Sequence, residues 1–171
     1  HVNLEHLHLA QGEIEELKTL LKNIHPWSTL HYGLTATDTI VHLCNKTIPE
    51  YFGKDIEVQV LTPQVRGTLG TVQLNQQLQD AINPLTPHQR QLKIGERLFR
   101  EGDRVIQTKN NYDLKVFNGD IGKIIRIDLE NFSCDISFGK GVIISYTRED
   151  MTELTLAYAI TIHKSQGSEF P

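Results

Sequence analysis

The sequence predicts an α/β fold that is interrupted by a small all-β module. Before about residue 98, apolar residues recur at helical spacing, and one β-branched run separates the helices. From about 98 to 150 the chain holds only short alternating runs and tight turns, and a mixed pattern returns after 150. The first pattern is typical of a layered α/β domain, and the second of a small SH3-type barrel.

Two helices are predicted before the first strand. Residues 12–23 and residues 35–48 carry apolar side chains at helical spacing. Because proline lacks a backbone N–H, Pro26 and Pro49 are predicted to end them. Residues 51–53 then read as a turn.

The next predicted elements are one strand and a third helix. Residues 56–61 alternate and are rich in β-branched side chains, which favours a strand. A loop with Pro63 and two glycines precedes a helix over 69–82. The apolar side chains expected to face the core from this helix are Val72, Leu74, Leu78 and Ile82.

The β-rich module is predicted from short runs separated by turn residues. The expected strands span 103–108, 122–129, 132–138 and 142–147. We therefore divide the chain into residues 1–97, with 1–54 the least readable part, the β-rich insert 98–150, and the return segment 151–171. Connecting segments are expected over 87–98 and 148–153.

Composition restricts the classes of function. The 171 residues carry a formal net charge of −4, which excludes a polybasic protein whose affinity comes from bulk charge. The longest apolar-leaning run has about nine residues, whereas a membrane span needs ~20. The two cysteines lie far apart and the eight histidines are scattered, so neither a disulfide nor a metal site is expected. These features predict a cytoplasmic protein without membrane contact.

Nucleotide binding by this chain alone is not expected. A P-loop needs Gly-x4-Gly-Lys-Ser/Thr, because its backbone N–H groups wrap the phosphates. Each Gly-Lys pair, at 53, 122 and 139, is followed by a residue other than Ser or Thr. No acidic pair follows an apolar strand, and no nucleophile–base pair supports a free-standing hydrolase.

A polar cluster follows the last apolar strand, in the run TLAYAITIHKSQGSEF. Ligands bind at strand ends in open α/β sheets, and Thr, Ser and backbone groups near a Lys can contact phosphates. The competing interpretation is a solvated loop after a buried strand.

Three blocks of the sequence resemble superfamily 1 DNA helicases of the RecD/TraA type. LAYAITIHKSQGSEF resembles their motif V, VQVLTPQVRGTLGTVQLNQQLQDAINP their motif IV region, and LFREGDRVIQTKNNYDLKVFNGDIGKI the start of their SH3-like 2B insert. The blocks keep the family's order and cover about residues 55–171. The family that the chain resembles includes the alpha subunit of exodeoxyribonuclease V.

The resemblance implies part of a motor that moves 5′ to 3′ on single-stranded DNA in recombination and repair. This chain would be an incomplete RecA-like domain 2A with 2B inserted. ATP and magnesium would serve the intact parent. No cofactor is expected in this piece, which lacks Walker A, Walker B and motif VI and is predicted to be inactive alone. Other subunits of a helicase–nuclease complex are candidate partners.

The resemblance also implies roles for single residues. Arg66 would face the γ-phosphate as an arginine finger, with a surface arginine as the alternative. The positions that match DNA-backbone contacts are Thr161, His163, Lys164 and Ser165. Gln166 and Gly167 would form the turn between the DNA and ATP sites, and Glu169 would accept a hydrogen bond from the ATP ribose.

Four residues of the insert are further candidates for the DNA strand: Asn110, Asn111, Tyr112 and Asn118. Tyr112 could stack on a base, but all four could equally be turn residues that serve the barrel. A different class of function also stays open, in which the SH3-like module binds a partner protein without catalysis. Grooves that bind proline-rich peptides are lined by aromatic residues. Since the insert has no tryptophan, binding of a proline-rich peptide is the less favoured form of this alternative.

Overall fold

The computed structural model describes residues 36–53, 56–139 and 141–165. The chain divides into two compact units, 1–57 and 58–171, and each is described by itself. No helix within the described residues has the length and apolar character needed to cross a bilayer. The predicted helix over 12–23 lies outside the described residues.

One continuous helical stretch occupies the described part of the first unit. It contains α2 (Ala36–His42), the π-helical turn η1 (Leu43–Thr47) and α3 (Ile48–Phe52). The prediction that Pro49 ends this helix is wrong. Pro49 lies where the π-helical turn passes into α3, and the helical backbone continues through it. The helix instead ends at Gly53, whose φ of 104° few other residues adopt.

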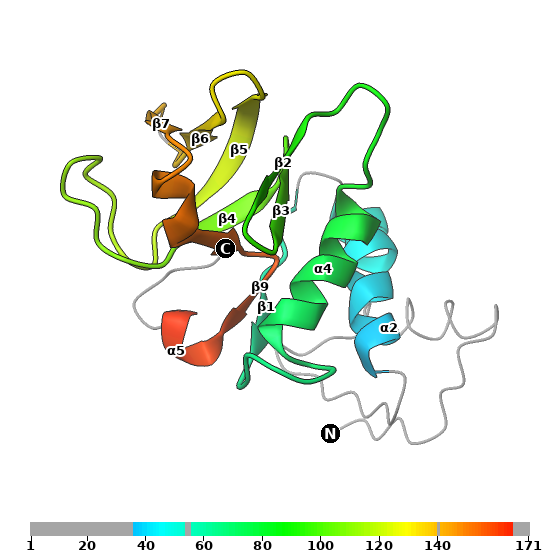
Figure 1. The fold of residues 1–171 in the computed structure, drawn as a ribbon. Helices are drawn as coiled ribbons and strands as arrows, with labels where there is room; N and C mark the ends of the chain where they lie inside the picture. Colours follow the sequence, from blue (N-terminus) through cyan, green and yellow to red (C-terminus); the bar gives the residue numbers. More distant parts are fainter. Residues whose placement is uncertain (1–35, 54–55, 140, 166–171) are drawn as a thin grey trace, which may run out of the picture. The chain divides into compact units, whose positions relative to one another are not determined.

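Two parallel strands form the α/β part of the second unit. β1 (Val60–Thr62) pairs in parallel with β9 (Ala159–Thr161), although about a hundred residues separate them in the chain (Figure 1). α4 (Thr71–Ile82) follows β1 and lies against β9. The predicted strand over 56–61 thus forms only from Val60 onward. The predicted mixture of helices and strands is confirmed.

The buried face of α4 differs from the predicted one. Leu74 and Leu78 are fully buried as expected. Val72 and Ile82, which were expected to face inward, are 64% and 43% exposed. Polar residues occupy the remaining buried positions of the helix, where they form hydrogen bonds to neighbouring strands.

The predicted connecting segment over 87–98 is wrong in its second half. β2 (Gln91–Ile94) and β3 (Arg97–Arg100) form an antiparallel hairpin there. Gly95, with φ of 61°, occupies the two-residue turn. The proposed boundary between 97 and 98 falls within this hairpin and stays a prediction.

A five-stranded antiparallel sheet forms the β-rich part. Its strands are β4 (Arg104–Gln107), β5 (Ile121–Asp128), β6 (Ser133–Ser137), β7 (Ile143–Tyr146) and β8 (Leu154–Leu156), in the order β7-β6-β5-β4-β8. The first four match the predicted strands, and each of their ends differs from the predicted one by a single residue. The short 3-10 helix η2 (Asp150–Glu153) leads into β8, so the sheet continues past the predicted boundary at 150.

One side of this sheet makes the main core. Phe99, Ile124, Ile136 and Tyr146 are each fully buried in it, and Met151 of η2 joins them.

Both cysteines are buried free thiols. Burial raises the pKa of Cys44 to about 11 and that of Cys134 to about 12, so neither is a reactive thiolate at neutral pH.

Candidate nucleotide and nucleic-acid interface

The carboxyl ends of β1 and β9 meet at one edge of the α/β part. Their register pairs Thr62 with Thr161, the last residue of each strand. Since the strands are parallel, the loop after β1 and the one-turn helix α5 (Ile162–Ser165) leave from the same edge. Ligands of open α/β sheets bind at such an edge, and it brings together the segments of Arg66 and Lys164.

Backbone bonds hold the loop that carries Arg66 against the start of α4. Thr71 and Val72 donate their N–H groups to the carbonyl oxygens of Gln64 and Val65, at 3.1 and 3.2 Å. Gly70 makes this close approach possible, because a Cβ there would lie 2.5 Å from the backbone of Val65. The side chain of Arg66 is exposed. Its loop is therefore fixed, while the guanidinium faces solvent.

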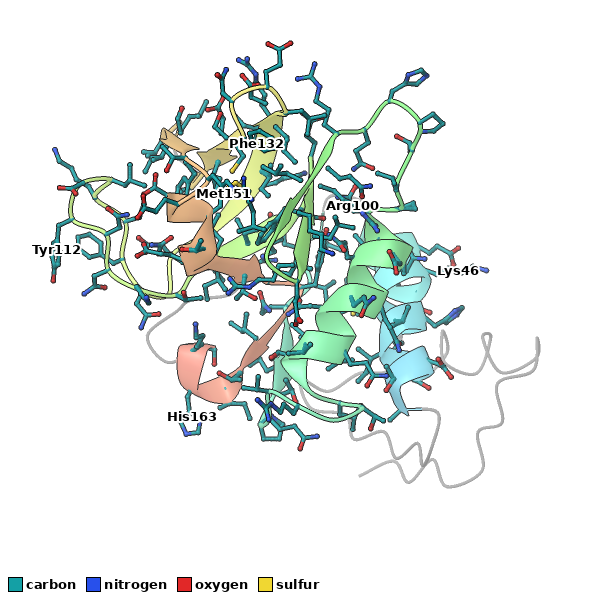
Figure 2. The ribbon with its side chains drawn as sticks, in the orientation of Figure 1. Lys46, Arg100, Tyr112, Phe132, Met151 and His163 are labelled. Atoms are coloured by element: carbon teal, nitrogen blue, oxygen red, sulfur yellow. The ribbon has the colours of Figure 1, made fainter. Side chains whose placement is uncertain are left out.

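The last residue of β9 and the helix α5 carry four predicted site residues. Thr161 is half-buried, and its Oγ1 lies 3.4 Å from the backbone N–H of Lys164. Ser165 donates its hydroxyl to the carbonyl of Ile162 at 2.7 Å, which completes the turn. His163 points into solvent (Figure 2).

Lys164 differs electrostatically from a surface lysine. It is half-buried, and burial lowers the pKa of its ammonium group. A partly desolvated cation gains more from an approaching anion than a fully hydrated one does. Gln166, Gly167 and Glu169 lie outside the described residues, so their predicted roles stay predictions.

The four candidate residues of the insert lie in the connection between β4 and β5. Asn111 exchanges both backbone hydrogen bonds with Val116, and its Oδ1 accepts the N–H of Leu114 at 3.1 Å. Asn110 Oδ1 accepts the N–H of Asn118 at 2.9 Å. The asparagines thus shape this loop, as the alternative interpretation of turn residues expected.

Tyr112 is different from these asparagines. Its side chain is 74% exposed, and its ring meets the Phe117 ring edge-to-face at 6.2 Å. Figure 2 shows it at the outer end of the loop. An exposed ring held by a second ring on a structured loop is suited to stacking on a planar ligand.

A polar cluster along α4 was not predicted from the sequence. Asn75 and Gln79 of α4 and Asn83, the C-cap residue that follows the helix, are spaced at four-residue intervals. Gln79 and Asn83 donate to the carboxylate of Asp103, at 2.6 and 2.8 Å. Burial raises the pKa of Asp103. The four hydrogen bonds that the carboxylate accepts act in the opposite direction, but their effect on the pKa is smaller. Only the four-residue spacing of the amides could have signalled this cluster.

Arg100 closes the other end of the cluster (Figure 2). It donates to the carbonyl of Asn83, the residue that ends α4, at 3.0 Å and pairs with Asp80 at 2.7 Å. No group of three or more metal-ligating side chains lies among the residues that the structure describes.

Comparison with known proteins shows that the chain is similar to RecD-like DNA helicases. Residues 74–138 match the family model of the ATP-dependent RecD-like DNA helicase SH3 domain. The chain is 38% identical over 113 residues to the ATP-dependent RecD2 DNA helicase of Deinococcus radiodurans, which covers 66% of this chain and 15% of the relative. It is 31% identical over 114 residues to the RecBCD enzyme subunit RecD of Buchnera aphidicola, covering 66% of this chain and 19% of that protein.

A likeness to solved structures is weaker. The crystal structure of Bacteroides Pif1 bound to ssDNA has a TM-score of 0.45 and 18% identity, covering 66% of this chain and 32% of that chain. The chain spans less than a fifth of the length of the RecD2 and RecD relatives.

Proposed function

We propose that this chain, a segment of a RecD-like DNA helicase, supplies the edge of the second motor domain at which ATP hydrolysis meets single-stranded DNA. Residues 1–97 and 151–171 would be part of the RecA-like domain 2A, and residues 98–150, which contain β4 to β7, would be the SH3-like 2B module. The match of residues 74–138 to the RecD-like SH3 domain supports this. The observation that carries it is the pairing of Thr62 with Thr161.

On the nucleotide side, Arg66 would act as the arginine finger. ATP with its magnesium ion would be the substrate, held by a P-loop domain elsewhere in the parent protein. Because the Arg66 loop is fixed to α4 by backbone bonds, its guanidinium would meet the γ-phosphate without reorganising the loop. Gln166, Gly167 and Glu169 would complete this side. The 171 residues alone would not hydrolyse ATP.

On the DNA side, Thr161 and Lys164 would contact phosphates of one strand. The half-buried ammonium of Lys164 would supply the charge and the Thr161 hydroxyl a hydrogen bond. His163 is exposed beside them, whereas the Ser165 hydroxyl is used within the turn. Tyr112 would stack on a base farther along the strand.

The wider role would be a 5′–3′ motor in DNA recombination and repair in the cytoplasm. A relative named as a subunit of the RecBCD enzyme raises the same possibility of partner subunits here. Polarity and partners follow from the family resemblance alone.

A salt titration of DNA binding tests the proposal. In the full-length protein, Lys164→Ala should weaken binding of an oligo-dT strand and make the slope of log affinity against log salt shallower by roughly 0.7, the single-strand value for one phosphate contact. DNA-stimulated ATP turnover should fall, while basal turnover stays. Lys93→Ala, which removes an exposed lysine on β2, is the control. An unchanged slope with normal DNA stimulation would show that Lys164 is only a solvated loop residue.

A further inference from the structure

Three amide side chains join α4 to the strands around it. Asn75 and Gln79 lie on one face of the helix because they are about one turn apart, and Asn83 follows as its C-cap residue. Gln79 and Asn83 both donate to Asp103 at the start of β4. Asn75, at the other end of the helix, makes a separate set of bonds.

Asn75 binds the backbone that leads into β9. Its Nδ2 donates to the carbonyl of Ala159 at 2.8 Å, and its Oδ1 accepts the N–H of the same residue at 2.8 Å. A third bond runs from Nδ2 to the carbonyl of Leu156, at 3.1 Å. Only 5% of Asn75 is exposed, so water cannot easily replace these bonds. The amide thus holds the chain as a neighbouring strand would.

The position of Asn75 connects the two parts of the candidate interface. It lies four residues after Thr71, whose N–H fixes the Arg66 loop through Gln64. Its partner Ala159 lies two residues before Thr161, where the proposed DNA contacts begin. One side chain therefore joins the element behind the proposed ATP contact to the strand before the proposed DNA contacts.

The strand segment at Ala159 is also held from other directions. Ala157 donates its N–H to Arg104 at 2.8 Å, and Val60 donates to the carbonyl of Tyr158 at 3.2 Å. Neither bond reaches α4. Within the part of the chain that the structure describes, the hydrogen bonds from Asn75 are the ones that link this helix directly to Ala159.

We infer that Asn75 is a positioning residue that couples the two ligands, so that binding of ATP changes the affinity for single-stranded DNA through the Asn75–Ala159 bonds. This inference rests on the function proposed above. Asn75 touches neither ligand. It would hold α4 and β9 in one relative position, so that a shift of the Arg66 loop moves Thr161 and Lys164 with it.

The test measures coupling rather than activity. A fluorescein-labelled oligo-dT strand is titrated into the full-length protein with and without a non-hydrolysable ATP analogue and magnesium. The ratio of the two affinities is the coupling factor, which for coupled sites is typically about 5–150-fold. Asn75→Asp keeps the shape and one acceptor, but it removes both Nδ2 bonds. The expected result is a coupling factor close to 1, with nucleotide-free DNA affinity and its salt slope unchanged.

A control from the same helix separates coupling from general loosening. Gln79→Leu removes buried hydrogen bonds to Asp103 and to the Leu98 carbonyl, and neither of these bonds goes to β9. It should lower the melting temperature and keep the coupling factor. If Asn75→Asp does not fold, Asn75→Ser is the second variant. Its side chain is too short to reach Ala159 and adds no charge, so the same loss of coupling is expected.

Three results would overturn the inference. One is a folded Asn75 variant with wild-type coupling, which leaves the proposed function intact if Lys164→Ala still makes the salt slope shallower. Another is an equal loss of coupling in Gln79→Leu, which would make the effect a loosening of α4. The third is a wild-type protein in which the two ligands do not influence each other.

Discussion

The Tyr158 hydroxyl donates a 2.9 Å hydrogen bond to Oδ1 of Asp103, across 55 residues of sequence. Asp103 is fully buried, and it also accepts the backbone N–H of Arg100 at 2.7 Å. With the amides of Gln79 and Asn83, four donors meet on one carboxylate. This carboxyl group thus ties α4, the start of the five-stranded sheet and the segment before β9 together.

Asp103 should make stability depend on pH in a defined direction. Burial raises its pKa in the folded protein above the unfolded value of about 3.9. Its stabilising contribution is therefore fully present below the unfolded pKa and is lost as pH rises through the folded pKa. Denaturant unfolding measured from about pH 4 upward should show this fall in the free energy of unfolding.

The control for this prediction is Asp103→Asn, which does not titrate. The hydrogen bonds to Asp128 lower the pKa of that carboxyl, so it gives a slope of opposite sign at lower pH. Since both proteins retain Asp128, the difference between their pH profiles isolates Asp103. Parallel profiles would contradict the prediction.

Gly70→Ala should destabilise the fold and displace the Arg66 loop. The new Cβ would lie 2.5–2.6 Å from backbone atoms of Val65 and Arg66, and such overpacking costs typically ~1–3 kcal/mol. The backbone of Gly70 has an ordinary φ of −78°, so the effect is steric alone. Thermal unfolding measures it.

Gly67→Ala is the matched comparison in the same loop. Gly67 has φ of 93°, and the nearest atom to an added Cβ is a side-chain nitrogen at 3.7 Å. It therefore tests backbone strain without a collision. In the full-length protein, Gly70→Ala should also lower ATP turnover, and a Gly70 variant as stable and active as wild type would refute the close-packing argument.

Arg66→Ala should abolish most ATP turnover in the full-length protein and leave DNA affinity nearly unchanged. Arginine fingers contribute roughly 10³–10⁵ in rate. Arg66→Lys should restore little, because an ammonium cannot make the bidentate contact. Arg126→Ala, an exposed arginine of β5, is the control. Turnover above about a tenth of wild type would indicate a surface role.

Tyr112→Ala should weaken single-stranded DNA binding by ~1–3 kcal/mol, the usual effect of losing one stacked base. Stability should change little, since the ring is 74% exposed. Tyr112→Phe should retain binding. Phe132→Ala removes another exposed ring, at the turn between β5 and β6, and serves as the control. Equal losses in both alanine variants would argue against a specific stacking site.

Local pattern was enough for many elements of the fold. β4 to β7 are where short β-branched runs and turn residues predict them. β6 buries alternate residues, as its alternating pattern predicts, whereas β4 buries Val105, Ile106 and Gln107 in succession. The hairpin at 91–100 was missed, although Leu92 and Ile94 alternate before a Gly-Glu turn. This alternation indicates a strand, although the segment as a whole is predicted here to be a connection.

The candidate interface was predicted less completely. A helical pattern shows which residues share a face, but it does not show what covers that face. Val72 and Ile82 were therefore assigned to the core, while Asn75 and Gln79 occupy it. An amide is buried only where partners are available, and here those partners are backbone groups of Leu156, Ala159 and Leu98, far away in sequence.

The sequence by itself determined the β-rich run, the turns that divide it, the lack of a P-loop and the family resemblance, because each depends on neighbouring residues or on a contiguous motif. Only the tertiary structure decided that Thr62 lies beside Thr161, that Asn75 binds Ala159 and that Asp103 is buried among four donors. Except for the bond between Arg100 and Asp103, these contacts join positions some 20 to 100 residues apart. Their formation depends on the geometry of parallel pairing and on burial, which no local pattern encodes.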